Sequence, residues 1–385
     1  MSGLALQEVR VIDLSAYLSG PYCSMILADH GADVIKIERP GEGDEARRMP
    51  PFINGESAPF MLWNRNKRSV TLDLKAPHDH ALCLDLAREA DVFIENFKPG
   101  VAQRLGLGYD SLAALNPRLI YCSISGFGQT GPYRARGGFD LMVQAMSGIM
   151  SVNGPEDGPP HRVPMAIADI GAGMFAAIGI LAALQARTRT GRGQHVDTAL
   201  YDAAVSFGLY EAAHLFGTGK NPPRLGQAHR ASAPYQAFRT SDGWITIGAN
   251  TQALWIKFCE VIGKSELAQD PRFRDNAARV ANRPALAALV QDALAARTTR
   301  DWMGRFESAG IPAGPVQSYA EVFADPQVIA REMISEIAHP SAAKAHTLGI
   351  PVKLSETPGA LRRPAPRLGE HTEEVLEELR RGRNT

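Results

Sequence analysis

The sequence predicts an α/β fold: an open, mostly parallel sheet with helices on both faces, followed by a second, smaller domain. Three observations support this prediction. Short β-type runs alternate with helical segments through the first half of the chain, and an almost uninterrupted apolar stretch lies near its middle. From residue 217 the composition changes to that of a linker containing glycine, proline and asparagine. Alternation of strands and helices is typical of parallel sheets.

The N-terminal elements begin with a strand–helix–strand unit. Val9–Leu14 and Ala32–Ile37 are β-type runs on either side of the helical segment Gly20–His30, which indicates a parallel βαβ unit. Further strands are predicted at Ser69–Leu74, Val92–Phe97, Leu119–Ser125 and Val196–Leu200, and helices at Pro77–Ala90 and Tyr201–Phe216. Ligands of such sheets bind beyond the carboxyl ends of the strands, where this chain has Glu38, Arg39, Lys75, Asn96, Phe97 and the glycine loop Gly126–Gly128.

The apolar stretch Val163–Arg187 predicts a buried central helix. After Ile170 it consists almost entirely of Ala, Gly, Ile, Leu, Met and Phe, which fall on every side of a helical wheel. The apolar run is shorter than the roughly 20 residues that a bilayer requires. Asp169 stands at the entrance of this helix. It is either an N-cap, the commoner role of such an aspartate, or a nucleophile facing a glycine-lined site, and the pattern alone leaves both open.

Composition narrows the classes of function. The chain has 385 residues, with 41 Lys and Arg against 41 Asp and Glu, so no net charge attracts nucleic acid. The four cysteines lie far apart without a CxxC pair, which argues against zinc and disulfides. The N-terminus runs into a strand pattern without a signal or transit segment. We therefore expect a cytoplasmic protein with no bound metal, no nucleic-acid partner and no membrane association.

One glycine motif is misleading. Gly126-Phe-Gly-Gln-Thr-Gly131 matches GxGxxG and follows a strand, but Pro132 comes next and no clean helix follows. A dinucleotide fingerprint needs that helix, because its N-terminus holds the pyrophosphate. We therefore expect a glycine loop that lines a pocket instead.

Basic residues in loops near the strand ends indicate a phosphate-rich, nucleotide-like ligand. Arginine and lysine clusters grip phosphates, although each residue alone is typical of a solvated surface. The cluster comprises Arg39, Arg65, Lys67, Arg68, Lys75 and Arg104.

The second half of the chain predicts a smaller domain between two connections. Gly217–Ser232 lacks periodicity and is predicted to be a linker, and Ile311–Pro315 marks the way back. Between them, two short runs joined by TSDG predict a β-hairpin, and helical stretches follow to Gly310. The hairpin runs are Tyr235–Phe238 and Trp244–Gly248; the tail adds strand-like runs at Ile334–Ala338 and Leu348–Leu354 and a charged helix after Thr372.

An ordered set of motifs resembles the class III CoA-transferases, the formyl-CoA transferase and carnitine CoA-transferase family. The motifs cover essentially the whole chain: LSGPYCSMILADHGADVIKIERPGEGD, NRNKRSVTLDLK, DVFIENFKPG with GLGY, ISGFGQTGP with GGFD, the Asp169 stretch, TGRGQ and LGEHT. The resemblance implies a large Rossmann-like domain with a parallel sheet, a small α+β domain, and an interlocked, ring-like homodimer. The implied boundaries are 1–216 and 331–385 for the large domain, 217–232 and 311–330 for the linkers, and 233–310 for the small domain.

The resemblance also implies the chemistry. Asp169 matches the nucleophile of the family's P-x-x-x-x-D-x-x-x-G pattern, here Pro164 to Gly173. CoA would move from an acyl-CoA donor to a carboxylic acid through an acyl-aspartyl anhydride and an aspartyl-CoA thioester. CoA is then a substrate, and no cofactor is tightly bound. The same resemblance implies that CoA is contacted by Arg39, Leu72 to Lys75, Asn96, Phe97, Arg104 and Arg136.

Departures from the formyl-CoA transferases bear on the substrate. Leu18 replaces a glutamine, and Gly248-Ala-Asn-Thr-Gln252 replaces a run of glycines. Formate and oxalate are therefore poor candidates, and the chain looks more like the branch that acts on dicarboxylates such as succinate, glutarate or citramalate, with succinyl-CoA as a candidate donor.

Two other hypotheses remain. One is an α-methylacyl-CoA racemase of the same superfamily, but Phe139 replaces the histidine of its GHD motif and cannot transfer a proton. The other is a CoA-binding protein without activity.

Overall fold

The computed structural model of the chain describes residues 3–382. These residues belong to two compact units. Unit 1 comprises Met1–Ile149, Arg162–Ala213 and Pro326–Thr385, and unit 2 comprises Met150–His161 and His214–Asp325. Residues 150–161, which the sequence placed in the large domain, thus group with the second unit.

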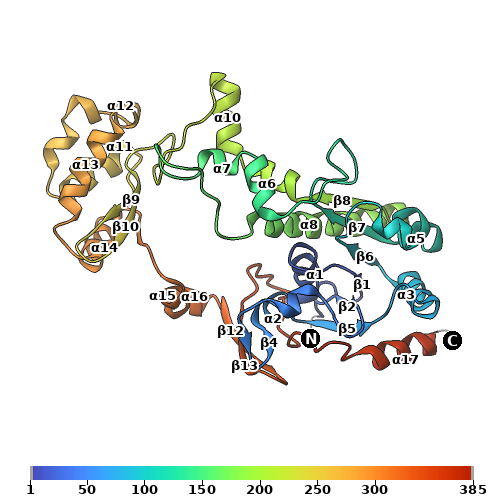
Figure 1. Ribbon diagram of the computed structural model, residues 1–385. Helices are drawn as coiled ribbons and strands as arrows, with labels where there is room; N and C mark the ends of the chain where they lie inside the picture. The colour runs from blue at the N-terminus through green and yellow to red at the C-terminus, as the bar shows by residue number, and fades with distance from the viewer. Residues whose placement is uncertain (1–2, 383–385) are drawn as a thin grey trace. The chain divides into compact units, whose positions relative to one another are not determined.

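Unit 1 is built on a six-stranded parallel sheet (Figure 1). The strands are β1 (Arg10–Asp13), β2 (Asp33–Glu38), β5 (Lys67–Thr71), β6 (Val92–Glu95), β7 (Ile120–Ser125) and β8 (His195–Ala199). Their spatial order is β5-β2-β1-β6-β7-β8, and every neighbouring pair is parallel. Counted along the chain this is 3-2-1-4-5-6, the order of the Rossmann fold. The predicted α/β class is therefore confirmed, and the strand order reverses between β1 and β6.

Helices cover both faces of this sheet. Three of them pack against one face around a core that includes Leu27, Ile94 and Ala176; they are α1 (Ser19–Asp29), α8 (Ile167–Thr190) and α9 (Leu200–Ser206). Three others pack against the opposite face around Leu86 and Phe93; they are α3 (Pro77–Glu89), α5 (Tyr109–Leu115) and α17 (Thr372–Gly382). The C-terminal helix thus completes the core of the N-terminal strands (Figure 1).

Helix α8 is apolar throughout, yet only one side of it is buried. At Gly173 it lies so close to α1 that a Cβ would be 2.6 Å from the carbonyl oxygen of Ser19. The opposite side exposes four large residues, Met174, Phe175, Ile178 and Leu181, by 40 % to 57 %. The prediction of a helix buried on every side is therefore wrong for the single chain, because the side with Ala172, Ala176 and Ile180 faces the core and the side with these four residues faces outward. By length and composition alone α8 would also span a bilayer, a test that core helices pass as well.

The remaining elements of unit 1 and its connections are short. After β2 come a 3-10 helix (Glu45–Arg48), the hairpin β3 (Phe52–Ile53) and β4 (Glu56–Ser57), and α2 (Ala58–Trp63). Helix α4 (Val101–Arg104) follows β6, α6 (Asp140–Met146) and α7 (Ile149–Val152) precede α8, and α10 (Leu209–Thr218) follows α9. Near the C-terminus lie α16 (Pro326–Ala330) and the antiparallel pair β12 (Ile334–His339) and β13 (Ala343–Leu348).

Unit 2 combines a small antiparallel sheet with helices. β9 (Tyr235–Arg239) and β10 (Trp244–Gly248) form the predicted hairpin, and β11 (Ala313–Pro315) pairs with β10. A separate core around Trp255, Phe258 and Phe306 joins the sheet to its helices. The helices are α11 (Gln252–Val261), α12 (Asn276–Ala281), α13 (Arg283–Leu294), α14 (Thr299–Ser308) and α15 (Tyr319–Ala324), with 3-10 turns at Ser265–Ala268 and Pro271–Phe273.

Two predicted elements are wrong. The helix predicted at Tyr201–Phe216 is two helices, α9 and α10, with a break at Phe207 and Gly208, since glycine is a poor helix former. The last strand ends at Leu348 instead of beginning there. Pro351, three residues further on, cannot donate a ladder hydrogen bond.

Candidate active site

A cavity of about 390 Å³ opens at the carboxyl edge of the parallel sheet, where the strand order reverses. Open α/β sheets bind their ligands at this position. Segments after β1, β6 and β7 form its wall together with the first turn of α8. The lining residues are Tyr17, Leu18, Ser19, Met49, Trp63, Asn96 to Pro99, Ile124 to Gly126, Arg136 to Phe139, Ala166, Asp169 and Leu200.

Asp169 is the third residue of α8 and lines this cavity. The N-cap position is Ala166, whose methyl group cannot cap, and the backbone N–H of Ala168 donates to Oδ1 of Asp140 at 2.9 Å. Asp140 therefore caps the helix from outside, and the hypothesis that Asp169 is the N-cap is wrong. The Asp169 carboxylate accepts a hydrogen bond from Ser19 and remains available to the cavity.

The surroundings of Asp169 raise the pKa of its carboxyl group to about 6. Burial is the largest cause and the negative charge of Asp140 adds to it, while the hydrogen bond from Ser19 acts in the opposite direction. Burial disfavours the charged form because it removes the solvation of the carboxylate. A poorly solvated carboxylate that is still ionised at neutral pH suits nucleophilic attack.

Helix α6 fixes the segment that leads into α8. The buried side chain of Gln144 accepts from the backbone N–H of Val163 at 2.8 Å and donates to the backbone oxygen of Val163 at 3.1 Å. It also donates to Oδ2 of Asp140 at 2.7 Å. Asp140 and Gln144, one helical turn apart, thus hold the approach to Asp169 from one side.

The glycine loop after β7 passes close to a second backbone segment. A Cβ at Gly126 would lie 2.8 Å from the Cα of Gly138, a separation that real side chains do not reach. Residues 126–139 contain no helix, and α6 begins only at Asp140. The helix that a dinucleotide fingerprint requires is therefore missing from this loop, and Gly126 and Gly138 line the cavity instead, as the sequence predicted.

Three of the predicted CoA residues, Asn96, Phe97 and Arg136, line the same cavity as the aspartate. The amide of Asn96 is bound to the backbone of Ala16: its Oδ1 accepts from the N–H at 2.9 Å and its Nδ2 donates to the carbonyl at 2.7 Å. The guanidinium of Arg136 lies 3.9 Å from the ring centroid of Tyr133, a cation–π arrangement.

The other four predicted CoA residues do not line the cavity. Arg39, Lys75 and Arg104 are exposed. Arg39 follows β2, and its guanidinium lies 2.8 Å from Glu42. Leu72 is buried in the core on the α3 face of the sheet, so only its backbone is available to a ligand.

A buried carboxylate supports the backbone at Phe97. Glu95, the last residue of β6, accepts hydrogen bonds from the Phe97 N–H at 2.8 Å and from Oγ of Ser123 at 2.6 Å. Burial raises the pKa of the Glu95 carboxyl to about 6. Oγ of Ser123 also lies 3.0 Å from Nε2 of His195, so side chains link the neighbouring strands β6, β7 and β8.

Sequence reasoning missed several lining residues. Tyr17 and Ser19 follow β1, and the rule that selected the residues after β2, β5, β6 and β7 also applies there. Met49 and Trp63 come from the connection between β2 and β5, whose path no periodic pattern specifies.

The chemistry available in the cavity is simple. Among the described residues that line it, Asp169 is the carboxylate and histidine does not occur. Phe139, in the place of the racemase histidine, is 67 % exposed. Within residues 3–382, no group of three His, Cys, Asp or Glu side chains could hold a metal ion.

The fold and the cavity define an α/β enzyme of the Rossmann type, and comparisons with known proteins narrow this class. The sequence profile of CoA-transferase family III matches residues 6–372. The chain is 41 % identical to succinyl-CoA:glutarate CoA-transferase of Mus musculus, across 98 % of this chain and 86 % of that protein. It is 43 % identical to acetyl-CoA:oxalate CoA-transferase of Acetobacter aceti, across 94 % and 92 %.

A solved structure agrees with these relatives. The crystal structure of a CAIB/BAIF family protein from Brucella suis superposes with a TM-score of 0.89 at 41 % identity, covering 98 % of this chain and 100 % of that one. The chain belongs to CoA-transferase family III. It is an enzyme that transfers CoA between an acyl-CoA and a carboxylate.

Proposed function

We propose that this enzyme transfers CoA from succinyl-CoA to a dicarboxylic acid through covalent intermediates on Asp169. The observation that carries the proposal is the placement of this carboxylate. It is partly buried at the start of α8 and lines the cavity at the switch point of the sheet, while Asp140 caps the helix in its stead.

The reaction consists of four acyl exchanges. The Asp169 carboxylate attacks the thioester carbonyl of the donor, the C–S bond breaks, and CoA leaves as a thiolate from a mixed anhydride. The thiolate attacks the aspartyl carbonyl, which releases the donor's carboxylate and forms an aspartyl-CoA thioester. The acceptor carboxylate attacks this thioester and displaces CoA again, and the thiolate then attacks the acceptor carbonyl of the second anhydride. New acyl-CoA and free Asp169 result without net proton transfer, and the route splits one difficult exchange into easier steps.

The cavity walls serve this route in two ways. Leu18, Met49, Trp63 and Phe139 are apolar or aromatic and help to exclude the water that would hydrolyse an anhydride. The hydrogen bond from Ser19 orients the Asp169 carboxylate. Backbone N–H groups of the glycine loop are the candidate donors to the oxyanions of the tetrahedral intermediates.

Positive charge near the carboxyl edge of the sheet suits the phosphates of CoA. Arg39, Lys75 and Arg104 are exposed outside the cavity, and Arg136 lines it. Arginine and lysine recognise phosphate through charge-assisted hydrogen bonds. The aromatic ring of Phe97 then suits the apolar part of CoA near the thioester.

The relatives support a dicarboxylic acid as the acceptor. Glutarate appears in the name of the mouse relative and oxalate in that of the Acetobacter relative, and both acids carry two carboxyl groups. Lys98 in the cavity lining offers positive charge to the carboxylate of the acceptor that does not react. The sequence argument against oxalate receives no support from the Acetobacter relative.

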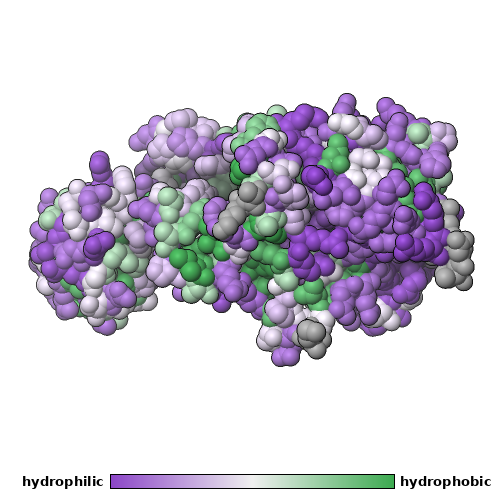
Figure 2. All heavy atoms as spheres, turned by 90° about the horizontal axis from the view of Figure 1, so that it is seen from below, coloured by the Kyte–Doolittle hydropathy of each residue, from purple (hydrophilic) through white to green (hydrophobic). Residues whose placement is uncertain are grey.

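We further propose that a second copy of the chain covers the exposed side of α8. Burial of each of the four large apolar side chains on that side would stabilise the association by about 1–2 kcal/mol. Apolar patches interrupt an otherwise polar surface on the face shown in Figure 2. The homodimer that the family resemblance implies would remove such surface from water.

Hydroxylamine labelling tests the covalent route. Protein mixed with succinyl-CoA and no acceptor is expected to accumulate activated aspartyl species, which hydroxylamine converts to a hydroxamate at Asp169. Peptide mass spectrometry locates the label. If several acyl-CoA donors leave Asp169 unlabelled while transfer proceeds, the covalent proposal is wrong.

The raised pKa of Asp169 predicts the pH dependence of the reaction. Only the ionised carboxylate attacks, so kcat/KM for acyl-CoA is expected to fall about tenfold per pH unit below a midpoint near pH 6. Replacing Asp140 by Asn removes a negative charge that raises this pKa but keeps an acceptor for Ala168, so the midpoint should move to lower pH. Steady-state rates between pH 5 and 8 measure both profiles, and an unshifted midpoint in the variant would contradict the assignment.

A further inference from the structure

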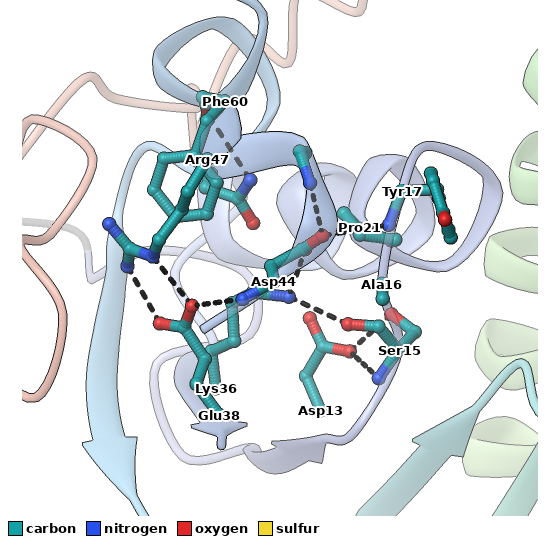
Figure 3. A network of polar contacts seen from close by, with 12 residues as sticks. Asp13, Ser15, Ala16, Tyr17, Pro21, Lys36, Glu38, Asp44, Arg47 and Phe60 are labelled. Carbon is teal, nitrogen blue, oxygen red and sulfur yellow. Dashed lines mark hydrogen bonds and ion pairs between the residues drawn. The ribbon is translucent and has the colours of Figure 1, made fainter. Parts of the chain in front are cut away.

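A short turn beside Asp169 places an aromatic ring in the cavity wall. We call residues Ser15, Ala16 and Tyr17 the tyrosine turn. Tyr17 has a φ of 64°, in the left-handed region that costs a non-glycine residue about 1–2 kcal/mol. Its side chain is 50 % exposed and lines the cavity together with Asp169. In Figure 3 its ring points away from the polar network that holds the turn.

The first half of this turn is held by charged side chains from two strands. The N–H of Ser15 donates to Oδ1 of Asp13 at 2.9 Å, and Nζ of Lys36 donates to the carbonyl of Ser15 at 2.6 Å (Figure 3). Asp13 ends β1 and Lys36 lies in β2, and both side chains are fully buried.

The second half is held by residues from two loops. The amide of Asn96 bonds both backbone groups of Ala16, as described above. The N–H of Tyr17 donates to Oδ1 of Asp44 at 3.0 Å. Five consecutive backbone polar groups, from the Ser15 N–H to the Tyr17 N–H, are thus each bonded to a side chain.

A buried ion pair links the two halves. Nζ of Lys36 lies 2.8 Å from Oδ2 of Asp44, and the two side chains are 0 % and 1 % exposed. Burial lowers the pKa of Lys36, but the carboxylates around it, Asp44 first, raise it above its ordinary value, so the lysine is charged. Asp44 is fixed in turn, because its N–H donates to Oε2 of Glu38 at 3.0 Å and Glu38 binds Arg47 at 2.7 Å.

Stability alone does not account for this arrangement. Buried ion pairs recover little more than their desolvation cost, and apolar replacements of similar volume are often neutral or stabilising. Strained backbone persists where the surroundings over-determine it, and such residues cluster at active sites. Here the over-determined residue is Tyr17, and its ring faces the cavity of Asp169.

We propose that the Lys36–Asp44 pair is a positioning device that presets Tyr17 as a rigid wall, against which the enzyme discriminates acyl chains by length. This inference rests on the proposed function, since it concerns substrates of Asp169. A fixed wall accepts an acyl chain of one length and hinders a chain that is one methylene longer. In such pockets one methylene changes kcat/KM by about 10–200-fold. If the Tyr17 ring could move, the cavity would also accept the longer chain.

The test compares acceptors that differ by one methylene. With succinyl-CoA as donor, kcat/KM is measured for glutarate and for adipate in the wild-type enzyme and in the double variant Lys36→Met with Asp44→Asn. This variant removes both charges together and retains Oδ1 of residue 44 as the acceptor for the Tyr17 N–H. The ratio of kcat/KM for glutarate to kcat/KM for adipate is expected to fall at least about fivefold towards one. The reason is that the fixed Tyr17 ring is proposed to cause the discrimination between chains that differ by one methylene.

A second ion pair of the same unit supplies the matched control. Nη2 of Arg187 lies 2.7 Å from Oδ1 of Asp91, at the far end of α8, about 27 Å along the helix from Asp169. This pair is less buried than Lys36–Asp44, since its side chains are 10 % and 27 % exposed. The double variant Arg187→Met with Asp91→Asn should therefore lose less stability and keep the wild-type ratio. A merely structural role of Lys36 and Asp44 would lower both kcat/KM values equally and leave the ratio unchanged, as in this control, and that result overturns the inference.

Two further measurements keep the test decisive. If the Lys36/Asp44 variant does not fold, Tyr17→Gly replaces it, because glycine adopts the same φ without strain and removes the ring while the network remains. An unchanged ratio in Tyr17→Gly, or a wild-type enzyme that does not discriminate glutarate from adipate, also overturns the inference. Hydroxylamine labelling of the wild-type enzyme distinguishes failure of the proposed function from failure of the inference about Tyr17. If Asp169 is not labelled, the proposed function is wrong. If Asp169 is labelled but the ratio is unchanged in the variants, only the inference about Tyr17 is wrong.

Discussion

The variant Asp169→Asn is expected to lose CoA transfer by about 10⁴-fold or more, because an amide cannot form the anhydride and loss of a nucleophile removes the covalent route. Asparagine has nearly the same shape and keeps an oxygen that accepts the hydrogen bond from Ser19. The fold and the cavity should therefore persist. Steady-state transfer from succinyl-CoA and the hydroxylamine label, both absent in the variant, measure the loss.

The same variant is expected to be more stable than the wild type at neutral pH. The folded-state pKa of Asp169 is raised to about 6 from an ordinary value of 3.8, so the folded state binds the proton more tightly than the unfolded chain. Stability is thus lost as the pH rises from about 4 to 6, by about 1–3 kcal/mol in total. Asparagine never ionises and avoids this cost. Thermal unfolding should show a higher midpoint for the variant at pH 7 and nearly equal midpoints at pH 4.

Asp110→Asn is the matched control. Asp110 also lies in the first turn of a helix, α5, but it is exposed and absent from the cavity lining. Its loss should leave transfer within about twofold and slightly lower stability, since carboxylates favour helix N-termini. A stabilised Asp169→Asn that still transfers CoA would show that another residue forms the covalent intermediate.

The sequence predicted much of the fold because its signals are local. Strand and helix runs of the first 125 residues occur where expected, within a few residues, since apolar runs bounded by Gly and Pro specify short buried strands. The carboxyl-edge rule then led to Asn96, Phe97 and Gly126, all of which line the cavity, but also to Glu38, Arg39 and Lys75, which do not. Asp169 also lines it, although its local pattern alone favoured an N-cap.

The features that sequence reasoning missed depend on contacts between distant segments. Asp140 caps α8 although it lies 28 residues away from Ala168 along the chain. No local pattern therefore reveals that Asp169 is not the N-cap. The tyrosine turn depends on Lys36, Asp44 and Asn96, which are distant from it along the chain and contact it only in the folded structure. Charged residues within strands are usually exposed, so a buried Lys36 is not expected from its type.

Helix α8 shows a different limit of single-chain reasoning. An apolar residue is predicted to be buried, but the pattern does not say against what. One side of α8, with Ala172, Ala176 and Ile180, packs within unit 1, whereas Met174, Phe175, Ile178 and Leu181 are exposed on the other side. If a second copy covers them, the whole helix is buried in the assembly and the composition of Val163–Arg187 is explained.

Replacing Ile178 by Arg is therefore expected to disrupt the proposed homodimer. Ile178 is 57 % exposed in the single chain, so arginine costs little there in a monomer. In a covered interface it would bury two unpaired charges, one from each copy, at several kcal/mol each. The wild-type protein should have twice the 41.6 kDa mass of the chain by light scattering. The variant should give monomer or aggregate and a lower unfolding midpoint.

Thr188→Arg adds the same charge to an exposed position of the same helix, beyond its apolar stripe, and should leave the dimer intact. This comparison separates a buried interface from a general effect of charge on α8. A wild-type mass of one chain, or equal behaviour of the two variants, would mean that the exposed side of α8 is not an interface between copies. The apolar side would then need a different partner, because four large hydrophobic side chains at i, i+1, i+4 and i+7 form one continuous strip along the helix, and strips of this kind are seldom left in water.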